Sequence, residues 1–148
     1  MILNILPIDP GITDVVKAYR FLKNRVRHTP TEYSFPLSEI CGAPVYIKWE
    51  NQQLCGSFKL RGALYKMNSL TPEERAKGVV TCSSGNHGQG VALAAKELGI
   101  RTQIFVPNVC PETKKSAIKR RGGEYVELVV TSGDYDFAEH SAHEQADR

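Results

Sequence analysis

Short apolar runs alternate with amphipathic stretches through the second half of the chain. The apolar runs are bounded by glycine, proline or polar clusters, and each is followed by a stretch with helical spacing of its apolar positions. The pattern predicts strands over residues 79–82, 102–106 and 124–130, and helices over 85–98, 111–121 and 134–146. Short links between such strands and helices are typical of parallel β-α-β units with right-handed crossovers. The expected fold class is therefore α/β, a three-layer structure in which helices flank a parallel twisted sheet.

The first half of the chain has a less regular pattern. Thr13 is the expected N-cap of a first helix, which should end at Thr29-Pro30 because the residue before a proline avoids the α region. Thr71 and Glu74 have the spacing of a capping box, which predicts a short helix start. Between these helices the pattern predicts a strand over 44–49, a polar loop over 51–57 and a helix over 58–70.

Composition excludes several functional classes. The 148 residues are 41% hydrophobic and 24% charged, as in an ordinary globular protein, which argues against a disordered tail. The 19 basic and 16 acidic residues leave a net charge of +3, which is too small to make nucleic acid the expected partner. No apolar run reaches the length of about 18 residues that a membrane-spanning helix needs, so no membrane association is expected.

The cysteines and the N-terminus indicate the compartment. The four cysteines do not form a Cys-x-x-Cys pair, and no histidine lies at zinc-ligand spacing from them. Reduced thiols and a cytoplasmic location are therefore expected, with no metal site. Residues 1–9 have no basic region, and Asp9 and Pro10 interrupt their apolar stretch, so they do not resemble a secretion signal.

The segment that most suggests chemistry is residues 81–90, with the sequence Thr-Cys-Ser-Ser-Gly-Asn-His-Gly-Gln-Gly. It joins a predicted strand to a predicted helix, and open α/β sheets bind ligands at the carboxyl ends of their strands. A helix N-terminus has free N–H groups and a partial positive charge, which favour an anion such as a carboxylate. The dinucleotide and P-loop patterns do not match, because the glycine spacing is reversed and no Gly-Lys-Ser/Thr follows. An ordinary capped helix start has the same pattern, so both interpretations stay open.

A second candidate is Lys59, which follows the aromatic Phe58 at the start of a predicted helix. The positive end of a helix disfavours a second positive charge and so favours a neutral amine. A neutral amine is the form that Schiff-base chemistry with an aldehyde requires. Most lysines at such positions are solvated surface residues, and from the position alone that plainer interpretation is favoured.

Both segments are similar to motifs of one enzyme family. Residues 50–63, Glu-Asn-Gln-Gln-Leu-Cys-Gly-Ser-Phe-Lys-Leu-Arg-Gly-Ala, resemble the lysine motif of the fold-type II pyridoxal-phosphate enzymes. Within that family they most resemble the branch of threonine/serine dehydratases (threonine ammonia-lyases) and serine racemases. Residues 83–90 resemble the substrate loop of the same branch, and Val106-Pro107, Pro111 and Lys114-Lys115 also match its pattern. Two independent motifs in the right order make the resemblance specific.

The resemblance implies roles for the residues of the two motifs. Lys59 would form a Schiff base with pyridoxal 5'-phosphate, Phe58 would pack against the cofactor ring, and Asn86 would hydrogen-bond the ring oxygen. Ser84 would be the acid/base on the ring face opposite Lys59. The substrate carboxylate would be held by the loop residues Ser83, Ser84, Gly85, Asn86 and His87. The implied reaction is a β-elimination in which Lys59 removes the α-proton and the cofactor acts as the electron sink. L-threonine, L-serine or a related hydroxy amino acid would give a 2-oxo acid and ammonia.

The resemblance also divides the chain into two parts. Residues 1–76 would be the N-terminal part of the large cofactor domain, carrying Lys59, and residues 77–148 would be the small α/β domain with the substrate loop. The family's glycine-rich phosphate cup and the polar residue that faces the pyridine nitrogen lie further downstream. So do the acidic ligands of a divalent cation in some members. The implied interpretation is an N-terminal fragment that binds the cofactor weakly at best.

Three functions stay open for the chain. The first is the dehydratase, or ammonia-lyase, whose partner is a small hydroxy amino acid. The second is an amino-acid racemase of the same branch, because Lys59 and Ser84 would supply a base on each face of the substrate Cα in either case. The third is a non-catalytic truncated domain that binds an amino-acid carboxylate or a partner subunit. Absence of the large domain would expose apolar surface and favour association, of which a homodimer is one form.

Overall fold

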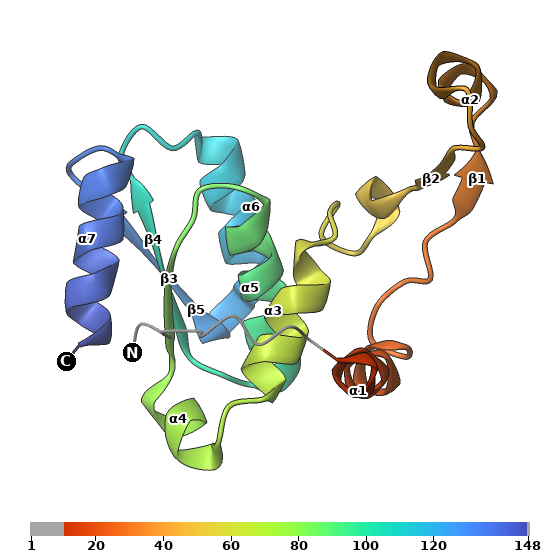
Figure 1. The fold of residues 1–148 in the computed structure, drawn as a ribbon. Helices are drawn as coiled ribbons and strands as arrows, with labels where there is room; N and C mark the ends of the chain where they lie inside the picture. The colour runs from red at the N-terminus through yellow and green to blue at the C-terminus, as the bar shows by residue number, and fades with distance from the viewer. Residues whose placement is uncertain (1–10, 148) are drawn as a thin grey trace.

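A computed structural model describes residues 11–147, and the centre of the molecule is a three-stranded parallel sheet (Figure 1). Its strands lie in the order β3 (Val79–Cys82), β4 (Thr102–Pro107) and β5 (Val126–Thr131). The register pairs Thr102 of the central strand with Val79 on one side and Val126 on the other. The carboxyl ends of all three strands therefore lie at one edge of the sheet, and the predicted α/β class is confirmed.

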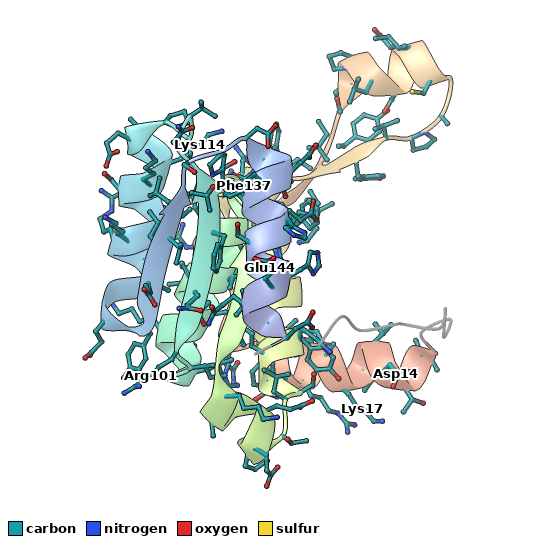
Figure 2. The ribbon with its side chains drawn as sticks, turned by 90° about the vertical axis from the view of Figure 1, so that its left-hand side faces the viewer. Asp14, Lys17, Arg101, Lys114, Phe137 and Glu144 are labelled. Atoms are coloured by element: carbon teal, nitrogen blue, oxygen red, sulfur yellow. The ribbon has the colours of Figure 1, made fainter. Side chains whose placement is uncertain are left out.

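Helices cover both faces of this sheet and give the molecule three layers (Figure 1). They are α3 (Lys59–Asn68), α5 (Asn86–Leu98), α6 (Glu112–Gly122) and α7 (Tyr135–Ala146). On one face α5 packs between α3 and α6, and on the other face α7 crosses β3 and β4. Figure 2 shows this second face, with Phe137 and Glu144 along α7 in front of the strands.

The core lies between the sheet and the layer formed by α3, α5 and α6. Small side chains on α5, namely those of Ala92, Ala94 and Ala95, let the neighbouring helices approach closely. Larger apolar residues fill the remaining space, and the fully buried ones include Leu60, Leu64, Ile104, Val106 and Ile118. Segments from both halves of the chain share this core, and the division between residues 76 and 77 stays a prediction.

Several elements end where local signals in the sequence predict. β3 ends at Cys82 and α5 at Leu98, just before Gly99, whose φ of +66° lies in the left-handed region that glycine adopts without strain. The predicted capping box is present at the start of α4 (Pro72–Lys77). There the Glu74 N–H donates to the Thr71 hydroxyl at 3.2 Å, and the Thr71 N–H donates to the Glu74 carboxylate at 2.8 Å.

The first helix differs from its prediction at both ends. α1 (Ile12–Leu22) contains Thr13, the predicted cap, inside its first turn. The helix also ends well before Thr29-Pro30. The backbone N–H of Arg27 donates to the side-chain oxygen of Gln53 at 2.9 Å, so this segment is bound to a distant loop instead of continuing the helix.

The strand predicted over residues 44–49 is shorter and has an unpredicted partner. β2 (Tyr46–Lys48) pairs antiparallel with β1 (Thr31–Tyr33). Between them lies α2 (Phe35–Cys41), which the pattern also does not predict. Elements this short contain too few residues for a periodic pattern of apolar positions to appear.

A smaller difference concerns β5, which begins at Val126 rather than at residue 124. Gly123 has a φ of +57° and opens a 3-10 turn, Gly123–Tyr125, which carries the chain from α6 into the strand. The observed ranges of β4, α6 and α7 agree with the predicted ones to within one residue at each end.

β1, α2 and β2 form an arm, residues 31–48, that projects away from the body of the molecule (Figure 1). Aromatic rings meet along it, with the ring centre of Tyr33 lying 5.0 Å from that of Phe35 and 5.5 Å from that of Tyr46. Phe35 and Ile40 are nevertheless 73% and 80% exposed. Exposed apolar surface of this extent is typical of a surface that another chain or segment covers.

Two features of the described residues concern membrane helices and disulfides. Within residues 11–147, no helix is both long enough and apolar enough to cross a membrane. All four cysteines are free thiols. The prediction that residues 1–9 are not a secretion signal lies outside the described residues.

We expect the arm to drive self-association of the chain. Ile40→Lys would place a charge within the exposed apolar surface and shift the chain toward the monomer. Val109→Lys is the matched control, because Val109 is 78% exposed but lies in the link between β4 and α6, outside the arm. Sedimentation velocity measures the shift. Equal association of the parent chain and Ile40→Lys would contradict the prediction.

Candidate active site

The loop between β3 and α5 is folded tightly on itself. The backbone N–H of the buried Ser83 donates to the carbonyl of Phe105 at 3.1 Å, and the Ser83 hydroxyl accepts from the N–H of Gly85 at 3.3 Å. A side chain at Gly88 would strike the carbonyl oxygen of Ser83. The loop is therefore anchored both to the central strand and to the first turn of the helix that follows it.

The first turn of α5 has hydrogen-bond donors without partners in the helix. Gly85 is the N-cap residue and no side chain caps the helix, so the N–H groups of Asn86, His87 and Gly88 lack an intrahelical acceptor. Open space lies before Gly85, where an added Cβ would meet nothing within 4 Å. The side chains of Ser84 and Asn86 form no hydrogen bond with another residue of the described part of the chain. These groups are available to a ligand.

Lys59 is the first residue of α3 and directly follows Phe58. Both side chains are exposed, and the Lys59 Nζ lies 4.9 Å from the centre of the Phe58 ring. Behind them the start of α3 lies against Gly90 of α5. An added Cβ at Gly90 would come within 3.1 Å of the Leu60 nitrogen and 3.2 Å of the Lys59 carbonyl carbon. The missing side chain at Gly90 therefore lets the two helix starts touch.

The electrostatics of His87 agree with the contact at Gly90. Desolvation of the imidazole lowers the pKa of His87 below its usual value of 6.5, and the positive charge of Lys59 lowers it further. His87 is therefore neutral near pH 7 and has one ring nitrogen able to accept a hydrogen bond. Two segments that are distant in the sequence thus meet at one place.

The two helices that meet at this site, like the short α2, differ from the other described helices in the charge of the first turn. Neither α3 nor α5 has an acidic residue in its first turn. α1, α4, α6 and α7 each have one or more there, namely Asp14, Glu73, Glu74, Glu112 and Asp136. An acidic residue in the first turn offsets the positive end of the helix dipole. Its absence from α3 and α5 leaves both positive ends available to an external anion.

All seven predicted site residues lie at these two helix starts. They are Phe58, Lys59, Ser83, Ser84, Gly85, Asn86 and His87. Together they present a primary amine, an aromatic ring, two hydroxyls, an amide and free N–H donors. This donor set fits an aldehyde cofactor and the carboxylate of an amino acid. The individual roles of the residues stay predictions.

A polar cluster behind Lys59 is not indicated by the sequence pattern. The Arg61 guanidinium donates to the two carboxylate oxygens of Glu50 at 3.0 and 2.7 Å, and the Thr29 hydroxyl donates to the same carboxylate at 2.6 Å. The hydrogen bond from Arg61, helped by that from Thr29, lowers the pKa of Glu50 from 4.5 to about 2 despite partial burial. Glu50 and Arg61 both belong to the lysine motif, but their spacing does not show that the two side chains face each other.

A large open hollow lies beside the site rather than in it. It has a volume of about 1170 Å³, and its lining includes Met67 of α3, Glu74 of α4 and Val80 of β3. Of the predicted site residues, only His87 lies on its wall. Within residues 11–147, no group of three His, Cys, Asp or Glu side chains could hold a metal ion.

Comparison with known proteins supplies the family. The family described as "Pyridoxal-phosphate dependent enzyme" matches residues 22–148. The chain belongs to this family. The resemblance on which the sequence analysis relies is thereby confirmed, and pyridoxal phosphate is the cofactor on which the family depends.

Relatives of this pyridoxal-phosphate dependent chain include dehydratases and a racemase. The L-threonine dehydratase biosynthetic IlvA of Corynebacterium glutamicum is 43% identical over 135 residues, which are 91% of this chain and 31% of that protein. The processed form of threonine deaminase isoform 2 from Solanum lycopersicum matches with a TM-score of 0.76 and 36% identity, over 93% of this chain and 41% of the other. Maize serine racemase matches with a TM-score of 0.78 and 32% identity, over 92% and 41%. The chain thus spans less than half the length of each of these proteins.

We expect Gly90→Val to force the two helix starts apart. The valine side chain would press on the backbone of Lys59 and Leu60, which should lower the free energy of unfolding by roughly 1–3 kcal/mol. Gly62→Val is the matched control, because an added Cβ at Gly62 would meet nothing within 4 Å. Urea denaturation measures both variants. A Gly90→Val variant as stable as Gly62→Val would show that the contact is not tight.

Ionisation of Glu50 should contribute to stability above pH 4.5. The pKa of Glu50 is about 2 in the folded chain and 4.5 when unperturbed, so the contribution is lost as the pH falls from 4.5 toward 2. Glu50→Gln has no such group to protonate. The difference in free energy of unfolding between the parent chain and this variant should therefore shrink over that range, as measured by urea denaturation at a series of pH values. A difference that does not change with pH would refute this assignment.

Proposed function

We propose that this chain carries the catalytic lysine and the substrate loop of a pyridoxal-phosphate-dependent ammonia-lyase. Its substrate is L-threonine, L-serine or a related hydroxy amino acid, and its products are a 2-oxo acid and ammonia. The observation that supports this most is the contact at Gly90, which joins the start of α3, with Lys59, to the uncapped start of α5. Relatives named threonine dehydratase and threonine deaminase support the choice of substrate.

In this proposal the start of α5 binds the substrate carboxylate. The N–H groups of Asn86, His87 and Gly88 have no acceptor within the helix, and no acidic side chain offsets the helix dipole. A carboxylate there gains hydrogen bonds and a favourable interaction with the dipole at once. The Ser83 hydroxyl accepts from Gly85 and keeps its own proton free to donate to the same carboxylate.

Lys59 and Ser84 move the protons. Pyridoxal phosphate, when bound, supplies the electron sink for the charge left at the α-carbon. The Nζ of Lys59 takes the α-proton. Ser84 acts as the acid/base on the opposite face, Phe58 packs against the cofactor ring, and Asn86 hydrogen-bonds the ring oxygen.

An amino-acid racemase is the second candidate. The similarity to maize serine racemase favours it, and the same pair of groups, Lys59 and Ser84, would act on the two faces of the α-carbon. Racemisation returns a proton to the α-carbon, whereas elimination expels the β-hydroxyl. The two functions therefore share their first step and differ in product.

The larger organisation of the protein is also a proposal. Residues 1–76 form part of the large cofactor domain, and residues 77–148 form the small domain. The four free thiols support a cytoplasmic location. The exposed apolar arm supports a homodimer as the assembled form.

Replacement of Lys59 tests the proposed function. The chain and, where the gene extends beyond codon 148, its full-length product are incubated with pyridoxal phosphate and L-threonine or L-serine. We expect the full-length product to release 2-oxo acid and ammonia, and Lys59→Ala to abolish the release because the base is lost. Lys66→Ala is the matched control, since Lys66 is an exposed lysine of the same helix.

The products separate the alternatives. Appearance of the D-amino acid without 2-oxo acid would favour the racemase. Absence of any product from every form of the protein would favour a non-catalytic domain that binds an amino-acid carboxylate. A Lys59→Ala variant as active as the parent would overturn both enzymatic proposals.

A further inference from the structure

Three segments of the chain meet around one carboxylate, that of Glu50. Arg61 of α3 donates to both of its oxygens, and Thr29 donates to one of them. The hydroxyl-bearing Thr29 is only 1% exposed, and the side chains of Glu50 and Arg61 are 19% and 30% exposed. This Thr29–Glu50–Arg61 group is referred to as the clamp.

The clamp closes the base of the arm. Thr29 precedes the arm and Glu50 follows it, and the Lys48 ammonium donates to the Thr29 carbonyl at 3.0 Å. Gln53 also connects the segments before and after the arm, because its side-chain amide donates to the carbonyl of Arg27 at 3.0 Å. The clamp is therefore the centre of a larger set of bonds between the arm base and the body.

The clamp also holds the helix turn that carries Lys59. Arg61 is the third residue of α3 and Lys59 the first, so both lie in one helical turn. On its other side this turn rests against Gly90. The Lys59 side chain itself is exposed and forms no hydrogen bond or ion pair within residues 11–147. The place of its amine therefore depends on what fixes the backbone of this turn.

We propose that Glu50, through Arg61, is a positioning residue for Lys59. The proposal rests on the proposed function, in which Lys59 bonds to the cofactor. Gly90 limits how closely the turn approaches α5, and the clamp prevents it from turning away. The arm base, the catalytic turn and the start of α5 thus form one connected unit.

The chemistry of the carboxylate explains why glutamine cannot replace Glu50 in the clamp. A carboxylate has two oxygens that accept from the Arg61 guanidinium in the two-point geometry this pair shows, with capacity left for Thr29. The side-chain amide introduced by Glu50→Gln has one acceptor oxygen and would turn an N–H₂ donor toward Arg61 or Thr29. At least one donor of the clamp would then lack a partner, and a partly buried donor without a partner is costly.

Trapping the lysine with a reductant tests the proposal without an activity assay. The amine of Lys59 and the aldehyde of pyridoxal phosphate form a carbon–nitrogen double bond with loss of water. Sodium borohydride then adds hydride to the carbon, and water supplies the proton to the nitrogen, which leaves a stable secondary amine. Mass spectrometry of peptides measures the modified fraction of Lys59 relative to that of Lys66 in the same sample.

We expect the Lys59-to-Lys66 ratio to fall about tenfold in Glu50→Gln, because a misplaced reacting group loses rate steeply. Arg61→Lys keeps the positive charge but loses the two-point geometry, and should show a smaller fall. Thr71→Ala is the control for stability alone. It breaks the capping box of α4, away from Lys59, and should leave the ratio unchanged. Circular dichroism confirms that every variant is folded at the temperature of trapping.

The outcomes separate this proposal from the one on which it rests. Where the gene extends beyond codon 148, a full-length product in which Lys59 is trapped no better than Lys66 contradicts the proposed function itself. A parent chain with preferred Lys59 trapping, and the same ratio in Glu50→Gln, overturns the positioning role alone. If Glu50→Gln does not fold, Thr29→Val is tested in its place, because it removes one hydrogen bond of the clamp. An unchanged Lys59-to-Lys66 ratio in Thr29→Val likewise overturns the positioning role.

Discussion

The contact between Gly90 and the start of α3 is the constraint on which the site depends. Leu60, next to Lys59, is fully buried, so the turn is fixed on the core side by packing as well as by the backbone contact. The contact brings two helix N-termini together, and neither has an acidic residue to offset its dipole. Positive charge from the two helix ends is therefore concentrated in a small region. An anionic ligand is attracted to this region, which is the physical reason that a carboxylate suits the site.

Where the sequence predicts the fold well, the signals are local. Glu74 reaches back to the residue three positions before it, and Gly99 ends α5 through its own φ of +66°. The strands of the parallel sheet are predicted in the same way, because each coincides with an apolar run of the sequence. In these cases an element is determined by residues within it or next to it.

Where the sequence does not predict the fold, residues distant in the sequence form hydrogen bonds with the backbone. α1 ends at Leu22, the following segment is bound through Arg27 to the distant Gln53, and no pattern near residue 22 indicates this. Each element of the arm is too short to show a periodic pattern of apolar positions. The site combines local signals that the sequence shows with a distant contact that it does not show. Its seven residues can be named from two local motifs, but their meeting depends on a contact between Gly90 and the turn at Lys59.

The shared geometry accounts for relatives with different names. A dehydratase and a racemase both need a lysine that bonds to the cofactor, donors for the substrate carboxylate, and a group on the opposite face of the α-carbon. In the proposed assignment all three lie at the starts of α3 and α5 in this chain. The structures of a threonine deaminase and a serine racemase match its fold with TM-scores of 0.76 and 0.78. These groups serve the step that the two reactions have in common. The choice between expelling a hydroxyl and returning a proton must therefore depend on groups that contact the β-carbon, and specificity can evolve there while the clamp, the lysine and the loop stay the same.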